Sequence, residues 1–422
     1  MPLLDWTYKP RIADEELRRR LEATGAVLIE GPKACGKTET ARQQAESEVL
    51  LDVDERARAA VAVDPALILD GQTPRLIDEW QVEPRIWNHI RRAVDERRLP
   101  GQFILAGSAV PADDSTRHSG AGRISRLRMR PMSSWEAGFS DGSISLRHLF
   151  ESGGSKADDR GVTLREVTEA IARGGWPAFQ GAPLGDAMAG VLDYLEEVCR
   201  TDINQVDGTR RDPLRVRRLM GSLARNVATH VAMATLAADA AHGGGDPLKQ
   251  HTVSEYLSAL ERLFVIEDQP PWEPHLRSRS ILRKSPKRHF VDPSLAVAAL
   301  GADPEGLLRD LNLLGFLFES LVVRDLRVYS QGARGKVSQF LDNKGLEVDA
   351  IVEFEGRWGA FEIKLGGEEN IEVGAANLRK FAGEVDTRRS GEPAVLGVIV
   401  AGGYGFSRED GVQVIPITAL GP

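Results

Sequence analysis

The chain has 422 residues, more than one hydrophobic core usually organises, so two or three domains are expected. Its apolar fraction of 42% and charged fraction of 27% are ordinary globular values and exclude a disordered chain. The net charge of −8 excludes a protein that binds nucleic acid through a global positive field, so only local basic surfaces could do so.

Two cysteines, Cys35 and Cys199, are too few for a disulfide framework and lack the spacing of a zinc site. The first ten residues lack a charged region followed by an apolar run, which argues against a secretory signal. The longest apolar stretches fall short of the roughly 18–20 residues that span a bilayer. We therefore expect a cytoplasmic protein without membrane contact.

The N-terminal part alternates apolar runs of strand length with helical segments, a pattern typical of a parallel sheet covered by helices. A charged helix is expected at 11–22. The expected strands lie at 26–30, 49–51, 75–77 and 103–106.

The rest of the chain divides into two further regions. A stretch rich in Gly, Ser and Asp at 138–160 marks the first boundary, and 161–265 has mostly helical patterns. Residues 252–268 indicate a helix that runs into a strand, weakly favouring a winged helix. A second α/β unit follows, with a long helix at 308–326, strands at 337–341, 347–353, 358–364 and 396–400, and a helix at 375–382. The predicted domains are thus 1–140, 141–300 and 301–422.

One loop carries a nucleotide-binding motif. Gly31-Pro32-Lys33-Ala34-Cys35-Gly36-Lys37-Thr38 matches GxxxxGK[ST], and it follows an apolar strand and opens a helix, as this motif requires. Backbone N–H groups of such a loop converge on phosphate oxygens. Lys37 is expected to reach the β- and γ-phosphates of ATP, and the Thr38 hydroxyl to bind Mg²⁺.

Polar residues end two of the other predicted strands. Asp78 and Glu79 follow 75–77; Asp78 is expected to support Mg²⁺ and Glu79 to polarise the attacking water. Ser108 follows 103–106 and is expected to lie beside the γ-phosphate. The alternative is that these are ordinary solvated residues at strand ends.

Arg123 follows a Gly-Ala-Gly step and precedes Arg126, Arg128 and Arg130. A guanidinium at this place could reach the γ-phosphate of a neighbouring subunit as an arginine finger, which predicts a homo-oligomer. The alternative is an arginine-rich solvated edge.

The order and spacing of these motifs resemble the AAA+ ATPases, and more narrowly a prokaryotic family that joins an AAA ATPase domain to a C-terminal domain of unknown function. The resemblance covers nearly the whole chain and implies ATP hydrolysis. Further matching segments are 105–109, 127–133, 174–177, 194–202, 252–263, 287–292, 345–349 and 362–364.

A carboxylate cluster is predicted near the C-terminus. Glu362 and Lys364 alternate along one strand and so share a face, and a hairpin would bring Asp349 beside them. Two carboxylates can bind Mg²⁺ and a lysine can activate water, which suits phosphodiester hydrolysis. Glu319, on the preceding helix, is a possible further ligand.

This arrangement resembles the PD-(D/E)xK nuclease fold, which is restriction-endonuclease-like, although Val348 stands where that pattern has proline. The open alternative is a retained fold whose Asp, Glu and Lys form a salt-bridged cluster without cleavage.

Two basic clusters favour DNA as a partner, with solvated helix faces as the alternative. A competing hypothesis is a nucleotide-switched protein-binding module with an inert C-terminal domain. The clusters are Arg277, Arg279, Arg283, Lys284, Lys287 and Arg288, and Arg210, Arg211, Arg215, Arg217 and Arg218.

Overall fold

The computed structural model describes residues 7–108, 119–154, 156–206, 208–240, 249–274 and 285–422. The chain forms two compact units, each assembled from three segments. Unit 1 comprises 1–131, 202–210 and 259–264, and unit 2 comprises 132–201, 211–258 and 265–422. The three predicted domain ranges remain a prediction.

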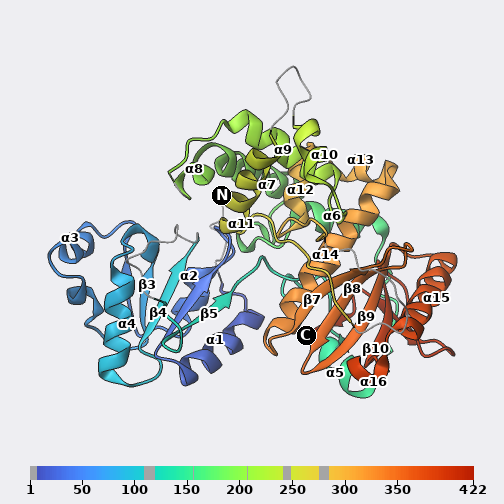
Figure 1. The fold of residues 1–422 in the computed structure, drawn as a ribbon, viewed down its shortest axis with the longest axis horizontal. Coiled ribbons are helices and arrows are strands. Elements are labelled where there is room, and N and C mark those ends of the chain that lie inside the picture. The colour runs from blue at the N-terminus through green and yellow to red at the C-terminus, as the bar shows by residue number, and fades with distance from the viewer. Residues whose placement is uncertain (1–6, 109–118, 155, 207, 241–248, 275–284) are drawn as a thin grey trace. The chain divides into compact units, whose positions relative to one another are not determined.

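Unit 1 is built on a five-stranded sheet with strand order β2-β3-β4-β1-β5, in which every pairing is parallel (Figure 1). The strands are β1 (Ala26–Glu30), β2 (Ser47–Leu50), β3 (Arg75–Asp78), β4 (Phe103–Gly107) and β5 (Ile124–Arg128). The helices of its N-terminal segment are α1 (Ile12–Ala23), α2 (Lys37–Arg42), α3 (Glu55–Val63) and α4 (Ile86–Arg97).

Alternate residues of the same strands feed two separate cores, because successive side chains point to opposite faces of a sheet. Leu28 and Leu105 pack with Ile90 of α4 in one core. Ile29 and Ile104 pack with Leu17 of α1 in the other. The predicted parallel α/β domain is confirmed, and since all strands are parallel, the P-loop, Asp78 and Ser108 emerge at one edge of the sheet.

The first part of unit 2 is helical, as predicted. Its helices are α5 (Leu146–Ser152), α6 (Leu164–Arg173), α7 (Leu184–Glu197), α9 (Pro213–Arg225), α10 (Met233–Asp239), α12 (Pro293–Leu300) and α13 (Pro304–Arg309); α11 (Gln250–Arg262) begins in unit 2 and ends in unit 1, and α8 (Ile203–Gln205) lies in unit 1. After α11 the described residues form isolated bridges, such as Ile266 with Phe290 and Gln269 with Lys287. The winged helix therefore stays a prediction.

A mixed sheet of order β11-β12-β10-β9-β8-β7 completes unit 2 (Figure 1). Strands β7, β8 and β9 pair antiparallel, whereas β9, β10 and β12 pair parallel. Helix α14 packs on β7–β9, and α15 packs on β8–β10. The bounds are α14 (Leu311–Gln331), β7 (Lys336–Leu341), β8 (Glu347–Phe354), β9 (Arg357–Lys364), α15 (Glu368–Glu384), α16 (Thr387–Ser390), β10 (Val395–Val400), β11 (Phe406–Ser407) and β12 (Gln413–Pro416); β6 (Ile144–Ser145) pairs with β13 (Leu420–Gly421) in a small separate sheet.

A buried charged network fastens the helical part of unit 2 to α14. Arg324 Nη1 lies 2.7 Å from Asp292 Oδ2, and Arg324 Nη2 lies 2.8 Å from Asp325 Oδ1. Asp292 also accepts a hydrogen bond from the Gly175 N–H, and Asp325 accepts one from the Ser134 N–H. Because these partners come from four separate segments, the network determines how those segments pack.

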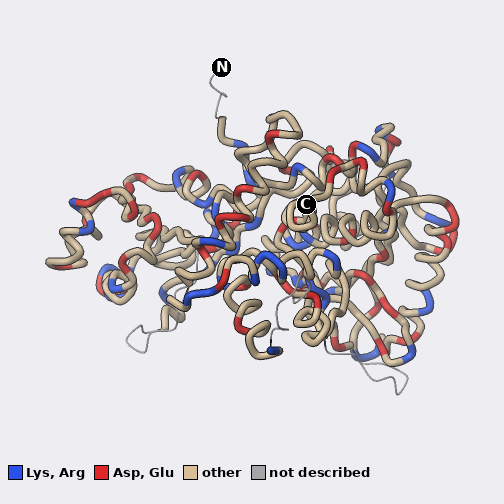
Figure 2. The backbone as a smooth tube through the Cα atoms, turned by 90° about the horizontal axis from the view of Figure 1, so that it is seen from above, with Lys and Arg blue, Asp and Glu red and all other residues tan. Residues whose placement is uncertain are grey.

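Within the described residues, no helix combines the length and apolarity needed to cross a bilayer. Basic and acidic residues are interspersed along the backbone of both units (Figure 2).

Candidate ATPase site and C-terminal carboxylate cluster

The P-loop runs from the end of β1 to the start of α2, and its shape requires small residues at defined points. Gly36 has a φ of 101°, a left-handed conformation that glycine adopts without strain. A Cβ at Gly31 would lie 2.1 Å from the Met129 carbonyl oxygen, so only glycine fits there. The loop thus wraps tightly at the N-terminus of α2, where phosphate binding is favoured.

Arg11, just before α1, anchors this loop from behind. Its Nη1 donates to the Cys35 carbonyl at 2.8 Å and its Nη2 donates to the Arg130 carbonyl at 2.9 Å. The side chain is buried, so these charge-assisted bonds are sheltered from water. Sequence reasoning missed Arg11, because nothing in its neighbourhood shows that it contacts residues 24 and 119 positions away.

We expect Arg11→Met to weaken ATP binding about tenfold, the equivalent of about 1.4 kcal/mol. The reason is that the P-loop loses charged hydrogen bonds, which typically contribute roughly 1.5–3 kcal/mol each. Titration with a fluorescent ATP analogue measures the Kd. Arg18→Met, an exposed arginine of α1, is the matched control, and equal affinities of the two variants would contradict the role of Arg11.

Lys37 and Thr38 lie where the motif predicts. The Lys37 ammonium donates to the carbonyl oxygens of Gly31 and Pro32 at 3.0 and 2.7 Å, closing the loop on itself. The Thr38 hydroxyl donates to Asp78 Oδ2 at 2.9 Å. Burial raises the pKa of Asp78, an effect that the Thr38 hydrogen bond opposes.

The Thr38 and Asp78 oxygens fit Mg²⁺. This ion prefers oxygen ligands and is usually held in nucleotide sites by one or two protein groups together with phosphates. The described residues contain no group of three or more His, Cys, Asp or Glu side chains placed to hold a metal ion by themselves. A nucleotide-dependent Mg²⁺ site needs no such group.

Glu79 lies next to Asp78 in a left-handed conformation with a φ of 50°, which is rare for a residue with a Cβ. Its carboxylate accepts a hydrogen bond from Gln81 Nε2 and one from the Ser108 hydroxyl at 3.4 Å. Strand β4 lies between β1 and β3, so Ser108 stands between the P-loop strand and the acidic pair. The structure thus brings Asp78, Glu79 and Ser108 together, and adds Gln81, to which sequence reasoning gave no role.

Lys33, a variable position of the loop, pairs with a residue far along the chain. Its Nζ lies 2.5 Å from Asp202 Oδ1, and the Asp202 side chain is only 4% exposed. Asp202 belongs to the short segment 202–210 that joins unit 1. The P-loop is therefore bound directly to the end of the 194–202 segment noted in the sequence.

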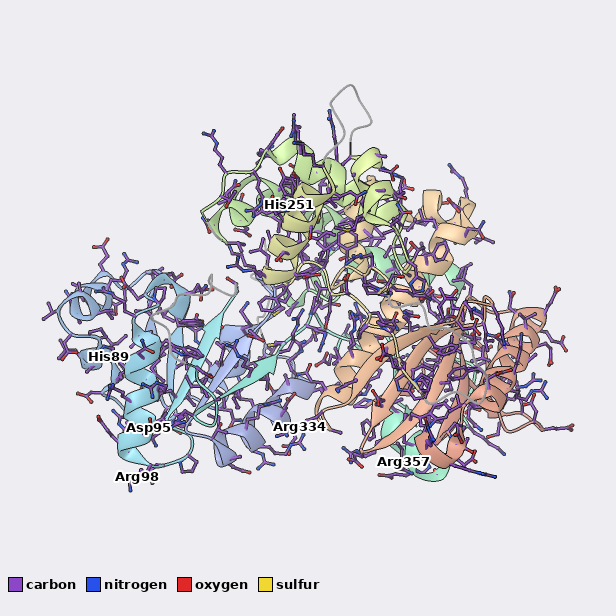
Figure 3. All side chains as sticks on the ribbon, viewed as in Figure 1. His89, Asp95, Arg98, His251, Arg334 and Arg357 are labelled. Atoms are coloured by element: carbon purple, nitrogen blue, oxygen red, sulfur yellow. The ribbon has the colours of Figure 1, made fainter. Side chains whose placement is uncertain are left out.

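Arg123 is not brought to this site. It immediately precedes β5, beside Ala26 at the start of β1, and so lies at the opposite edge of the sheet from the P-loop. Its Nε lies 2.8 Å from Asp95 of α4, labelled in Figure 3. A catalytic role within its own chain is excluded by this placement, and only the role toward a neighbouring subunit remains as a prediction.

In unit 2, Asp349, Glu362 and Lys364 lie together as predicted. Lys364 Nζ is 2.6 Å from Glu362 Oε2 and 3.3 Å from Asp349 Oδ2. Asp349 Oδ2 also accepts the Ile363 N–H at 2.9 Å, and Glu362 Oε1 accepts from Asn377 Nδ2 at 2.7 Å. The predicted pairing of β8 with β9 produces this arrangement.

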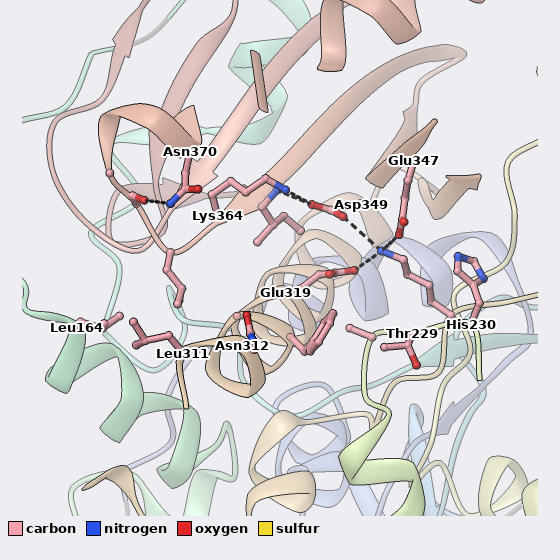
Figure 4. A pocket seen from close by; sticks show the side chains of 18 residues that line it. Leu164, Thr229, His230, Leu311, Asn312, Glu319, Glu347, Asp349, Lys364 and Asn370 are labelled. Atoms are coloured by element: carbon pink, nitrogen blue, oxygen red, sulfur yellow. Dashed lines mark hydrogen bonds and ion pairs between the residues drawn. The ribbon is translucent and has the colours of Figure 1, made fainter. Parts of the chain in front are cut away.

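Lys287 completes the cluster and was wrongly grouped with surface cations. Its ammonium lies 2.7 Å from Glu319, 2.7 Å from Glu347 and 3.4 Å from Asp349 (Figure 4). The neighbouring Arg288 is likewise paired, with Asp268. The other four members of that basic cluster, Arg277, Arg279, Arg283 and Lys284, lie outside the described residues.

Burial and ion pairing shift the titration of these groups. Burial, with the nearby Asp349 carboxylate, raises the pKa of Glu319 to about 8 despite the Lys287 ammonium. Burial also raises the pKa of Glu362 to about 7. Burial alone would raise the pKa of Asp349, but the ammonium groups of Lys287 and Lys364 outweigh it and lower that pKa.

We expect the stability of unit 2 to fall as pH rises from about 5 to about 9, because folded Glu319 keeps its proton to higher pH than the unfolded chain does. The contribution is complete below the ordinary pKa of 4.5 and is lost as pH passes about 8. Glu319→Gln should flatten this dependence in urea unfolding. Glu355→Gln, at an exposed site, is the control, and identical slopes for both variants would refute the assignment.

A parallel sheet with a P-loop, an adjacent Asp-Glu pair and a polar residue on the intervening strand defines the class of P-loop ATPases. Residues 23–137 match the family described as AAA domain. Residues 164–306 and 314–420 match two families described as domains of unknown function, DUF8612 and DUF4143.

Similar whole chains are known from two mycobacteria. An uncharacterized protein of Mycobacterium bovis and one of Mycobacterium tuberculosis are each 27% identical over 420 residues, which is 96% of this chain and 83% of each relative. Among solved structures, a Walker-type ATPase of Pyrococcus abyssi is similar at 14% identity with a TM-score of 0.43, over 70% of this chain and 99% of that one.

Proposed function

We propose that this protein is a Mg²⁺-dependent ATP hydrolase of the AAA+ type. The observation that carries the proposal is the 2.9 Å hydrogen bond between Thr38 and Asp78 at the head of the P-loop. Bound between Thr38, Asp78 and the phosphates, Mg²⁺ would neutralise charge that develops on the phosphoryl oxygens. Asp78 and Thr38 are the residues that would hold it.

In this proposal each polar residue has one task. Lys37 exchanges its two carbonyl partners for the β- and γ-phosphates. Glu79 accepts the proton of a water whose oxygen attacks the γ-phosphorus, while the bond from phosphorus to the ADP oxygen breaks. Ser108 contacts the γ-phosphate. Its hydroxyl also donates a hydrogen bond to Glu79, so it connects the γ-phosphate with the general base.

The proposal includes assembly into a homo-oligomer in the cytoplasm, with Arg123 acting on a neighbouring subunit. Arg123 is 45% exposed and Asp95 is 40% exposed, and an ion pair this open contributes at most about 1 kcal/mol. Arg123 is therefore free to change partners at low energetic cost.

We further propose DNA as the partner on which ATP hydrolysis acts. Support comes from the second basic cluster, in which Arg210 and Arg215 are exposed, although Arg211 is buried beside the Tyr256 ring and Arg217 is paired with Glu196. The helix–three-strand–helix–strand order of the C-terminal sheet is in keeping with a nuclease-like domain that binds DNA.

A second candidate is a nucleotide-switched module that binds a protein partner through an inert C-terminal domain. The observation that favours it is Lys287, because its ammonium pairs with Glu319 and Asp349, two of the carboxyl groups that were predicted to bind the metal ion.

ATP turnover with Mg²⁺, measured alone and with duplex, forked or single-stranded DNA, separates the two. DNA binding predicts stimulation that falls with salt and is lost in Arg215→Gln/Arg218→Gln. Arg165→Gln/Arg309→Gln, at exposed arginines elsewhere in unit 2, is the matched control. If none of the DNA forms changed the rate of ATP turnover, the nucleotide-switched protein-binding module would be favoured. If no ATP were hydrolysed at all, the proposal of an ATP hydrolase would be refuted.

A further inference from the structure

Backbone hydrogen bonds as well as ion pairs hold Lys287 in place. Its N–H donates to the Gln269 carbonyl at 3.1 Å, and its own carbonyl accepts the Gln269 N–H at 2.9 Å. The next residue, Arg288, donates its N–H to the Thr229 carbonyl at 3.1 Å. The segment that carries Lys287 therefore has a fixed register beside the sheet.

Gln269, which is fully buried, joins that segment to the cluster itself. Its side-chain amide donates to the carbonyl of Ser338 on β7 at 3.0 Å and to the carbonyl of Asp349 on β8 at 2.9 Å. Its amide oxygen lies 3.1 Å from His289 Nε2. The backbone that presents Lys287 and the backbone that presents Asp349 are thus locked together.

The Lys287 ammonium occupies the position that a metal cation would take among carboxyl ligands. Lys287 has three N–H donors, and three carboxyl groups from two elements surround it, namely Glu319 of α14 and both Glu347 and Asp349 of β8 (Figure 4). The Lys287 side chain is only 2% exposed, so water does not replace these partners. A buried charge is tolerated only with such pairing.

Further acceptor positions of Asp349 and Glu362 are also taken. Asp349 Oδ2 receives the Ile363 N–H and Lys364, and Glu362 receives Lys364 and Asn377. A divalent ion could use Asp349 and Glu319 only if the Lys287 ammonium moved away. These residues, as arranged, do not fit the metal site that their spacing predicts.

We infer that Lys287 stands in for a metal ion in this cluster, so that the C-terminal domain keeps its fold without divalent metal and gains a metal site when Lys287 is removed. A cavity of about 890 Å³ adjoins the cluster, lined by Lys287, Glu319, Glu347 and Asp349 on one side and by Leu311 and Phe316 on another. The opening gives a metal ion from solvent a route to the vacated position.

The test is Mn²⁺ binding by the nucleotide-free full chain, in a background of Asp78→Asn that removes the P-loop contribution. The chain that retains Lys287 should bind no Mn²⁺ at the cluster, and Mn²⁺ should not change its melting temperature. Lys287→Met should melt at a lower temperature, bind one Mn²⁺ per chain and regain its melting temperature when Mn²⁺ is added. Lys344→Met, at an exposed lysine between β7 and β8, should behave as wild type.

Two results would overturn the inference: Mn²⁺ bound with Lys287 present and lost in Asp349→Asn, or no Mn²⁺ gained by Lys287→Met. If Lys287→Met does not fold, Lys287→Met/Glu347→Gln decides the matter, because it removes one carboxyl partner together with the ammonium and leaves Asp349 and Glu319 as ligands. If this double variant also failed to fold, the inference that Lys287 only takes the place of a metal ion would be refuted. ATP turnover of the same variants with Asp78 intact reports separately on the proposed hydrolase.

Discussion

Replacement of Glu79 by Gln is expected to lower the rate constant for ATP hydrolysis by about 10²–10⁴-fold, the usual contribution of a positioned general base. Gln keeps the shape and can still accept a hydrogen bond from Ser108, but it cannot take the proton of the attacking water. ATP affinity should change little, because the P-loop contacts are intact. Phosphate release measures the rate, and a fluorescent ATP analogue measures the binding.

The matched control for Glu79 is Glu83→Gln, four residues further on, where the carboxylate pairs with Arg85 at 3.2 Å. This change should leave the rate within about twofold of wild type, a difference of roughly 0.4 kcal/mol. If both variants kept full turnover, the base would have to be another residue. If Glu79→Gln lost nucleotide binding instead, its role would be to hold the loop rather than to activate water.

Replacement of Arg324 by Met is expected to destabilise unit 2 by about 3–5 kcal/mol, because it leaves Asp292 and Asp325 buried without their countercharge. Both aspartates are completely buried. Burial raises the pKa of Asp325 even with Arg324 beside it. Urea unfolding followed by circular dichroism measures the loss.

Arg165→Met is the control for Arg324, since Arg165 is 52% exposed and pairs with an exposed Glu305. Such a surface pair contributes at most about 1 kcal/mol. A loss for Arg324→Met no larger than that of the control would mean that the network is replaceable by apolar packing.

The ATPase site was predictable because its residues follow strand ends in a parallel sheet, where local sequence determines the position in space. The P-loop, Asp78 and Ser108 are all of this kind. The C-terminal cluster was predictable to the extent that one hairpin, β8 with β9, makes it.

The misses are contacts between segments that no local pattern links. Lys287 meets Glu319 and Asp349 across 32 and 62 residues, and stood in a run of cations that looked solvent-facing. Lys33 meets Asp202 across 169 residues.

The discontinuous build of unit 1 limits how the protein can be divided experimentally. A chain ended at residue 140 would keep all five strands of the first sheet but lose 202–210 and 259–264, which belong to the same unit. It would also lose Asp202, leaving Lys33 of the phosphate-binding loop without that partner. Comparisons of nucleotide binding therefore use the intact polypeptide, in which Lys33 keeps its partner.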